Sequence, residues 1–128
     1  MREEDLAAVA GLCREVHGFE RAGELKSLST VLTPFVALRG GRVTGYASAP
    51  GFWPLGHAAA EGEEDMRALL AGAAAQSDAP LSFLLPTRQA GLFRWCLSKG
   101  MRVVKTMTLM ATGEYREPCG SYLTSVLY

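Results

Sequence analysis

A short strand turns into a helix in the stretch HAAAEGEEDMRALLAGAAAQ, residues 57–76. The segment His57–Glu61 is predicted to be the strand. Residues 62–76 are predicted to be the helix, because their larger apolar side chains recur at helical spacing. The turn between them, Gly62-Glu63-Glu64-Asp65, is acidic, and acids at a helix start interact favourably with the positive end of the helix dipole. We therefore expect this turn to stabilise and cap the helix.

Toward the N-terminus the chain is predicted to form two helices and a β-hairpin. In order, the predicted elements are a helix over 5–16, a shorter helix over 23–28, and strands over 34–38 and 43–48. Asp5 is a candidate N-cap of the first helix, and His17-Gly18 is a typical end. Arg39-Gly40-Gly41-Arg42 predicts the hairpin turn, because glycine readily adopts the positive φ of tight turns.

Toward the C-terminus strands and one helix alternate. The predicted elements are a strand over 81–85, a helix over 87–99, a strand over 101–111, a loop over 112–120 and a strand over 121–128. Residues 81–85 are almost continuously apolar, as in a strand that is buried on both faces. Thr87 is a candidate N-cap for the helix and Gly100 a candidate C-cap.

This order predicts a single α/β domain over residues 1–128, of the α+β kind with a mixed sheet. It has about six strands and three or four helices. Helices between successive strands predict at least one parallel, right-handed crossover.

Composition excludes several classes of protein. Thirteen basic residues balance thirteen acidic ones, so net charge attracts this domain neither to nucleic acid nor to an anionic membrane. No apolar run is long enough for a membrane helix, and MREEDL lacks the apolar core of a signal peptide. The three widely spaced cysteines predict neither a disulfide framework nor a zinc site. Reduced thiols are typical of a cytoplasmic protein.

Several stretches resemble the GNAT N-acetyltransferase superfamily, in particular the C-terminal domain of bacterial proteins with two GNAT-like domains. The resemblance rests on residues 5–25, on 83–97, and on the end of the chain with Met107–Met110, Gly113–Tyr115, Pro118 and Tyr128. It covers nearly the whole chain and is most specific from Leu92 to Gly100. It implies a GNAT-like fold that lacks the first strand.

The resemblance also implies where acetyl-CoA would bind, if the domain is active. In the superfamily the cofactor lies in a gap between the fourth and fifth strands, here 57–61 and 81–85. The cofactor would lie near Ala59, Ala60, Glu61 and Gln89. Its pyrophosphate sits on a Gln/Arg-x-x-Gly-x-Gly/Ala loop before the next helix, where free N–H groups and the helix dipole attract anions. Here that place holds Glu63, Glu64 and Asp65, which repel a pyrophosphate.

Other site residues follow from the same resemblance. Cys96, four residues before Gly100, stands where members often have a tyrosine general acid, and Glu61 where some have a general base. A buried small side chain and a solvated strand-end carboxylate are the alternatives for these two. The candidate acceptor-binding residues after the first helix are His17, Phe19 and Arg21, with a helix C-cap as the alternative for His17. Trp53 is a further candidate from the residues themselves: with Phe52 and Trp95 it marks a ligand or partner surface if exposed, and is core if buried. No metal ligands are predicted.

The absent first strand leaves 34–38 with an open edge, and open edges invite pairing with another chain. The chain is then either a fragment whose partner domain is missing, or a short protein that covers the edge by dimerising or with its loop at 19–30. We expect a degenerate GNAT-like domain that binds a small molecule, a second GNAT-like domain or a second copy through strand edges. The alternative is an active N-acetyltransferase on a small amine with a non-standard cofactor site.

Overall fold

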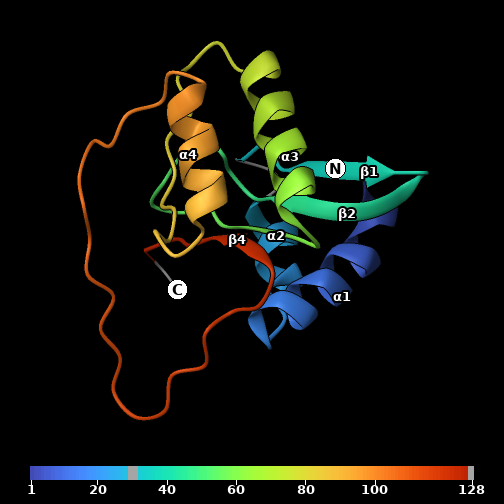
Figure 1. The fold of residues 1–128 in the computed structure, drawn as a ribbon. Helices are drawn as coiled ribbons and strands as arrows, with labels where there is room; N and C mark the ends of the chain where they lie inside the picture. The colour runs from blue at the N-terminus through green and yellow to red at the C-terminus, as the bar shows by residue number, and fades with distance from the viewer. Residues whose placement is uncertain (29–31, 127–128) are drawn as a thin grey trace.

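The computed structural model describes residues 1–28 and 32–126, and its fold is α+β (Figure 1). After a 3-10 turn over Glu3–Asp5, the elements in order are α1 (Leu6–His17), α2 (Ala22–Leu28), β1 (Phe35–Arg39), β2 (Arg42–Ala47), β3 (Ala58–Ala60), α3 (Glu63–Gln76), α4 (Ala90–Ser98) and β4 (Ser121–Leu123). None of these helices is both long enough and apolar enough to cross a membrane.

The sheet has the order β1-β2-β3-β4, and every pairing between these strands is antiparallel. The hairpin turn is confirmed, with φ of 58° at Gly40 and 81° at Gly41. The predicted parallel crossover is wrong for the described strands, because the last strand, and not residues 81–85, pairs with β3.

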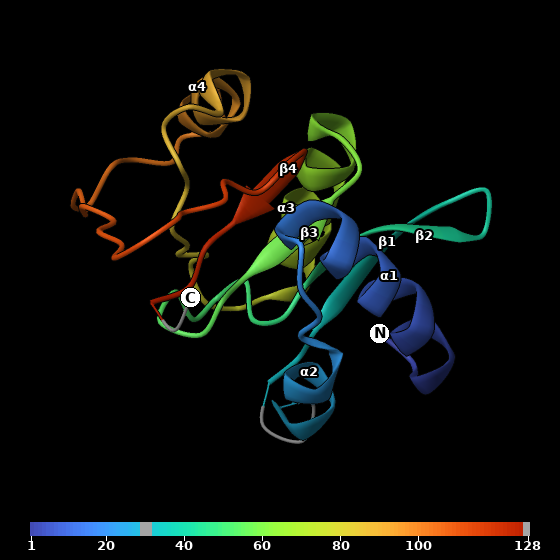
Figure 2. The ribbon, with the colours of Figure 1, turned by 90° about the horizontal axis from the view of Figure 1, so that it is seen from below.

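Helices cover both faces of the sheet (Figure 2). The three small residues of β3 alternate between them: Ala58 and Ala60 pack with α3, and Ala59 packs with α1. Their small side chains let both helices approach the sheet closely. Because successive side chains of a strand point to opposite faces of the sheet, this short run of alanines contributes to the hydrophobic core on each face.

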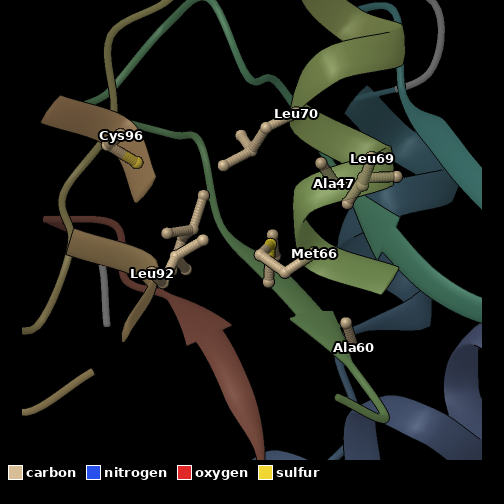
Figure 3. Close-up of a cluster of buried hydrophobic side chains, with 9 residues drawn as sticks. Ala47, Ala60, Met66, Leu69, Leu70, Leu92 and Cys96 are labelled. Carbon is tan, nitrogen blue, oxygen red and sulfur yellow. The ribbon is translucent and has the colours of Figure 1, made fainter. Parts of the chain in front are cut away.

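The helix pair α3 and α4 completes the core on one face. Met66 and Leu70 of α3 point toward Leu92 and Cys96 of α4 (Figure 3). This packing confirms the apolar face predicted for residues 62–76. The predicted end of the next helix near Gly100 is also confirmed, because α4 ends at Ser98 and Gly100 has a φ of 83°.

The predicted caps are partly wrong. Asp5 is the N-cap residue of α1 as predicted, but its side chain makes no capping hydrogen bond. It accepts a hydrogen bond of 2.6 Å from the N–H of Arg2 and so closes the preceding 3-10 turn. Gly18 ends α1 as predicted, with φ of 83°. Thr87 does not cap α4, because that helix begins at Ala90 with Gln89 as its N-cap.

Two predicted strands do not form. Residues 81–85 are half-buried and make a single bridge, from Leu84 to Thr124. β4 pairs with the edge of β3 that these residues were expected to occupy. The flanking Pro80 and Pro86 also have no backbone N–H group to donate to a neighbouring strand. Residues 101–111 are extended but unpaired, because alternation gives strand propensity without supplying a neighbouring edge.

The final strand is shorter than predicted, ending at Leu123 within the predicted span 121–128; residues 127–128 lie outside the described part of the chain. Residues 1–28 and 32–126 therefore contain four strands and not six.

Candidate functional site

The acidic turn at the start of α3 is held by the β-hairpin. The carboxylate of Asp65 is buried and accepts a hydrogen bond of 2.8 Å from the hydroxyl of Thr44. It also pairs with the guanidinium of Arg39. Burial opposes the ionised carboxylate, but the hydrogen bonds from Arg39 and Thr44 outweigh it and lower the pKa of Asp65.

The neighbouring acids also have partners. Glu61 pairs with Arg42, whose Nη2 lies 2.8 Å from Oε2, and this hydrogen bond lowers the pKa of Glu61. Glu63 pairs with Arg67 one turn along α3. Its carboxylate also lies so close to Gly91, in the first turn of α4, that a Cβ there would collide with it.

The acids therefore link elements and do not cap the helix as the sequence predicted. Gly62 is the N-cap of α3, and no side chain makes a capping hydrogen bond there. The carboxylates project onto arginines of the hairpin and of α3, and Glu64 remains exposed. An incoming pyrophosphate would meet this cluster of carboxylates at the place where the resemblance puts it.

The gap expected to hold acetyl-CoA contains a strand. β4 pairs with β3 through Ala59↔Tyr122 and Ala60↔Ser121, and Thr124 then bridges to Leu84. The last strand thus lies between the two segments that were expected to border the gap.

Gln89, a candidate cofactor contact, holds β4 instead. Its side-chain N–H donates to the carbonyl of Tyr122 at 2.6 Å, and its Oε1 accepts from the hydroxyl of Ser121 at 3.0 Å and the N–H of Tyr122 at 3.1 Å. One amide side chain therefore meets the backbone of the strand that fills the gap.

The two candidate catalytic residues lie in different environments. Cys96 is buried in the core beside Leu92, and burial raises the pKa of its thiol (Figure 3). Glu61 lies at the end of β3 in its ion pair with Arg42. A thiol in an apolar core is a poor proton donor, and an ion-paired carboxylate with a lowered pKa is a weak base.

Three of the four candidate acceptor residues lie together. The ring centroids of His17 and Phe19 are 5.9 Å apart, and burial, followed by the nearby charge of Arg21, lowers the pKa of His17. Arg21 is itself buried and forms a double hydrogen bond with Glu24, at 2.7 and 3.0 Å. Trp53 instead contacts Lys105, whose Nζ lies 4.4 Å from the ring centroid.

The structure adds a second histidine to this cluster. His57 is buried, its ring is 5.6 Å from that of Tyr46, and its Nδ1 is 3.1 Å from the hydroxyl of Ser48. Burial, then the charge of Arg21, lowers the pKa of His57 to about 3, and the same two causes lower that of His17 to about 4. Both imidazoles are therefore neutral near pH 7, and this polar cluster cannot supply a histidine cation there.

Sequence reasoning missed the partners of the acids. The sequence identifies Arg39 and Arg42 only as the flanks of a glycine turn, and Thr44 only as a strand residue. The available signal was charge: two arginines beside the hairpin turn have no acid in that hairpin, whereas the turn after β3 holds an excess of acids.

Comparisons with protein-family models, curated proteins and solved structures found no match to this chain. Within residues 1–28 and 32–126, no group of three or more histidine, cysteine, aspartate or glutamate side chains is placed to hold a metal ion.

Proposed function

We propose that this chain is a degenerate GNAT-like domain that binds a protein partner and does not transfer acetyl groups. The sequence resemblance supports descent from the GNAT superfamily. The arrangement of charged side chains around the start of α3 supports the loss of cofactor binding. Its three free thiols support a place in the cytoplasm.

The observation that carries the proposal is the position of Asp65. Its buried carboxylate occupies the start of α3 and is bonded to Thr44 and Arg39. The backbone donors of the first turn of α3 have no side-chain cap, but a pyrophosphate also needs positive charge at that helix end. The nearby charges that could attract it, those of Arg39, Arg42 and Arg67, are already paired with Asp65, Glu61 and Glu63.

The alternative, an active N-acetyltransferase, has weaker support. Direct attack of an amine on a thioester needs a base, a donor for the developing oxyanion and a positioned cofactor. The candidate base Glu61 is ion-paired, the imidazole of His57 has a pKa of about 3, and β4 fills the expected cofactor gap.

Thermal unfolding with increasing acetyl-CoA tests the proposal, with an active GNAT acetyltransferase measured in parallel. A ligand present at 100 times its dissociation constant stabilises a protein by about 2.7 kcal/mol. We expect no shift for this chain at millimolar acetyl-CoA, and a clear shift for the active enzyme.

A dose-dependent shift would overturn the proposal if it is lost on changing the acidic turn. Glu63→Lys is the appropriate variant, and Glu114→Lys makes the same charge change at an exposed residue away from the turn. Acetyl transfer to a small amine, followed by release of free CoA thiol, would establish the alternative directly.

A further inference from the structure

A groove runs along the free edge of β1, beside α3. Its first hollow has a volume of about 420 Å³ and is lined by β1 and by residues of α3 that include Glu64, Ala68, Leu69 and Gly72. A second hollow of about 260 Å³ continues it toward the loop after β2, and the two share Phe35 and Gln76. We call this the β1–α3 groove. Its length along β1 and its apolar floor suit an added strand.

The side chains of β1 that face this groove alternate as a strand requires. Phe35 and Ala37 pack toward α3, and Arg39 pairs with Asp65 on the same helix. β2 pairs with one edge of β1, and β1 is the terminal strand of the described sheet. The other edge therefore presents backbone groups that can pair with a further strand.

Residues 101–111 are an extended apolar segment without a place in the sheet. Within the described chain, the backbone of 102–111 makes no backbone hydrogen bond. Its large side chains are exposed, at 84 % for Val104 and 60 % for Leu109. Such a run of exposed apolar side chains on unpaired, strand-prone backbone marks an interaction surface.

The exposed segment is tethered on the side away from β1, and its Lys105 contacts Trp53 in the loop after β2. It follows α4 and leads back to β4, whereas β1 is at the opposite edge of the sheet; Figures 1 and 2 both show α3 and the sheet between them. A second copy can present the segment to the groove without crossing its own fold.

We propose that residues 101–111 of one copy add as a strand to β1 of a second copy and lie in its β1–α3 groove. This rests on the proposed partner-binding function and names the partner as the chain itself. Period-two spacing puts Val103, Met107 and Leu109 on one face of the added strand, toward α3, and leaves Met110 on the other face.

Charge favours the same occupant. Lys105, whose Nζ lies over the ring of Trp53 within one copy, belongs to the α3-facing set of the segment, and would exchange that contact for the exposed carboxylate of Glu64 in the groove of a second copy. Asp65 is already neutralised by Arg39, so Glu64 is the acid of the groove that is left to receive a cation. Opposite charges at the rim of an interface fix register and partner choice.

Sedimentation analysis over a range of concentrations is the first test. We expect a reversible dimer or larger assembly for the full chain. Leu109→Asp should weaken association by roughly a hundredfold, because it would bury a charge against α3. Met110→Asp is the matched control: its exposed side chain, on the opposite face of the segment, should tolerate the same charge with little change.

A charge-exchange experiment then tests the groove itself. Lys105→Glu and Glu64→Lys should each weaken association by roughly tenfold, and the double variant should restore most of it. Lys99→Glu and Glu114→Lys are controls at exposed residues outside the segment and groove. Circular dichroism establishes that each variant is folded.

A chain that stays monomeric at high concentration overturns this inference but not the loss of acetyl-CoA binding. Association that survives Leu109→Asp, or single variants without rescue, shows that another surface is used and also overturns it. Binding of acetyl-CoA in the thermal experiment contradicts the proposed function while leaving the association result intact, so the two failures are distinguishable.

Discussion

The hydroxyl of Thr44 donates a hydrogen bond of 2.8 Å to the buried carboxylate of Asp65 and thereby ties the middle of β2 to the first turn of α3. Arg39, at the end of β1, binds the same carboxylate. The first helix after the alanine strand is thus fixed to the hairpin on its own side of the sheet. The acids of this turn hold the fold together at the place where the proposed GNAT-like descent would put the cofactor.

Thr44→Val should destabilise the domain. Valine keeps the shape of threonine but leaves a buried carboxylate oxygen without its donor, which costs about 1–3 kcal/mol. Urea unfolding measures the change. Glu114→Gln is the control, because Glu114 is exposed and lies outside both the acidic turn and the β1–α3 groove, so its change should cost less than about 0.5 kcal/mol. Equal effects of the two variants would show that the hydrogen bond from Thr44 to Asp65 does not stabilise the fold.

The stability of the domain should fall as pH drops below about 6.5. The pKa of His17 is lowered to about 4 and that of His57 to about 3 in the folded chain. Between these values and 6.5, the unfolded chain therefore binds more protons than the folded chain. Their stabilising contribution is complete above the unfolded pKa of 6.5 and is lost as pH falls toward the folded values. Each histidine gives a slope of up to about 1.4 kcal/mol per pH unit.

The chain contains only these two histidines, which makes the control clean. Urea unfolding of His17→Gln/His57→Gln, across a series of pH values from neutrality to about pH 4, should show a much flatter dependence. The carboxylates Asp65 and Glu61 have lowered pKa values, so their contribution is lost only at lower pH. An unchanged slope in the double variant would show that the histidines are not buried as described.

Patterns within short stretches of sequence predicted the elements that are held together by contacts between residues close in the chain. Helix α3, the hairpin and the end of α1 at Gly18 each followed from periodicity and glycine placement. The segment His57–Glu61 is predicted to be a strand, but the sequence does not predict that its neighbour is β4. Pairing joins residues that are about sixty positions apart, from Ala60 to Ser121, and no local pattern encodes it.

The same limit explains the wrong strands. Residues 81–85 and 101–111 carry strand composition, but a strand forms only where an unpaired edge is available, and β4 takes the edge of β3. Within the candidate site, the acidic turn was located from sequence, whereas the roles of Thr44 and Gln89 depend on contacts across the fold.

Cys119 should be the fast-reacting thiol of the native protein. It is exposed, whereas Cys13 and Cys96 are buried and burial raises the pKa of Cys96. A thiol reagent should therefore label one cysteine rapidly in the native state and all three in denaturant. Cys119→Ser should remove the fast phase. Rapid labelling of Cys96 in that variant would instead indicate the accessible thiol that a general acid needs.

Gly56→Ala should destabilise the loop between β2 and β3. A Cβ at this residue would meet the backbone carbonyl oxygens of Ala49 and Phe52, the second at 3.0 Å, and the N–H of Gly56 is fixed by a hydrogen bond of 2.8 Å to Phe52. Backbone atoms cannot rotate aside as a side chain does, so we expect a cost of about 1–3 kcal/mol. Gly51→Ala in the same loop is the matched control, because a Cβ there meets nothing within 4 Å. Urea unfolding of the two variants should separate them clearly. Equal stabilities would mean that the turn of the chain at Phe52 is not as tight as its hydrogen bonds indicate.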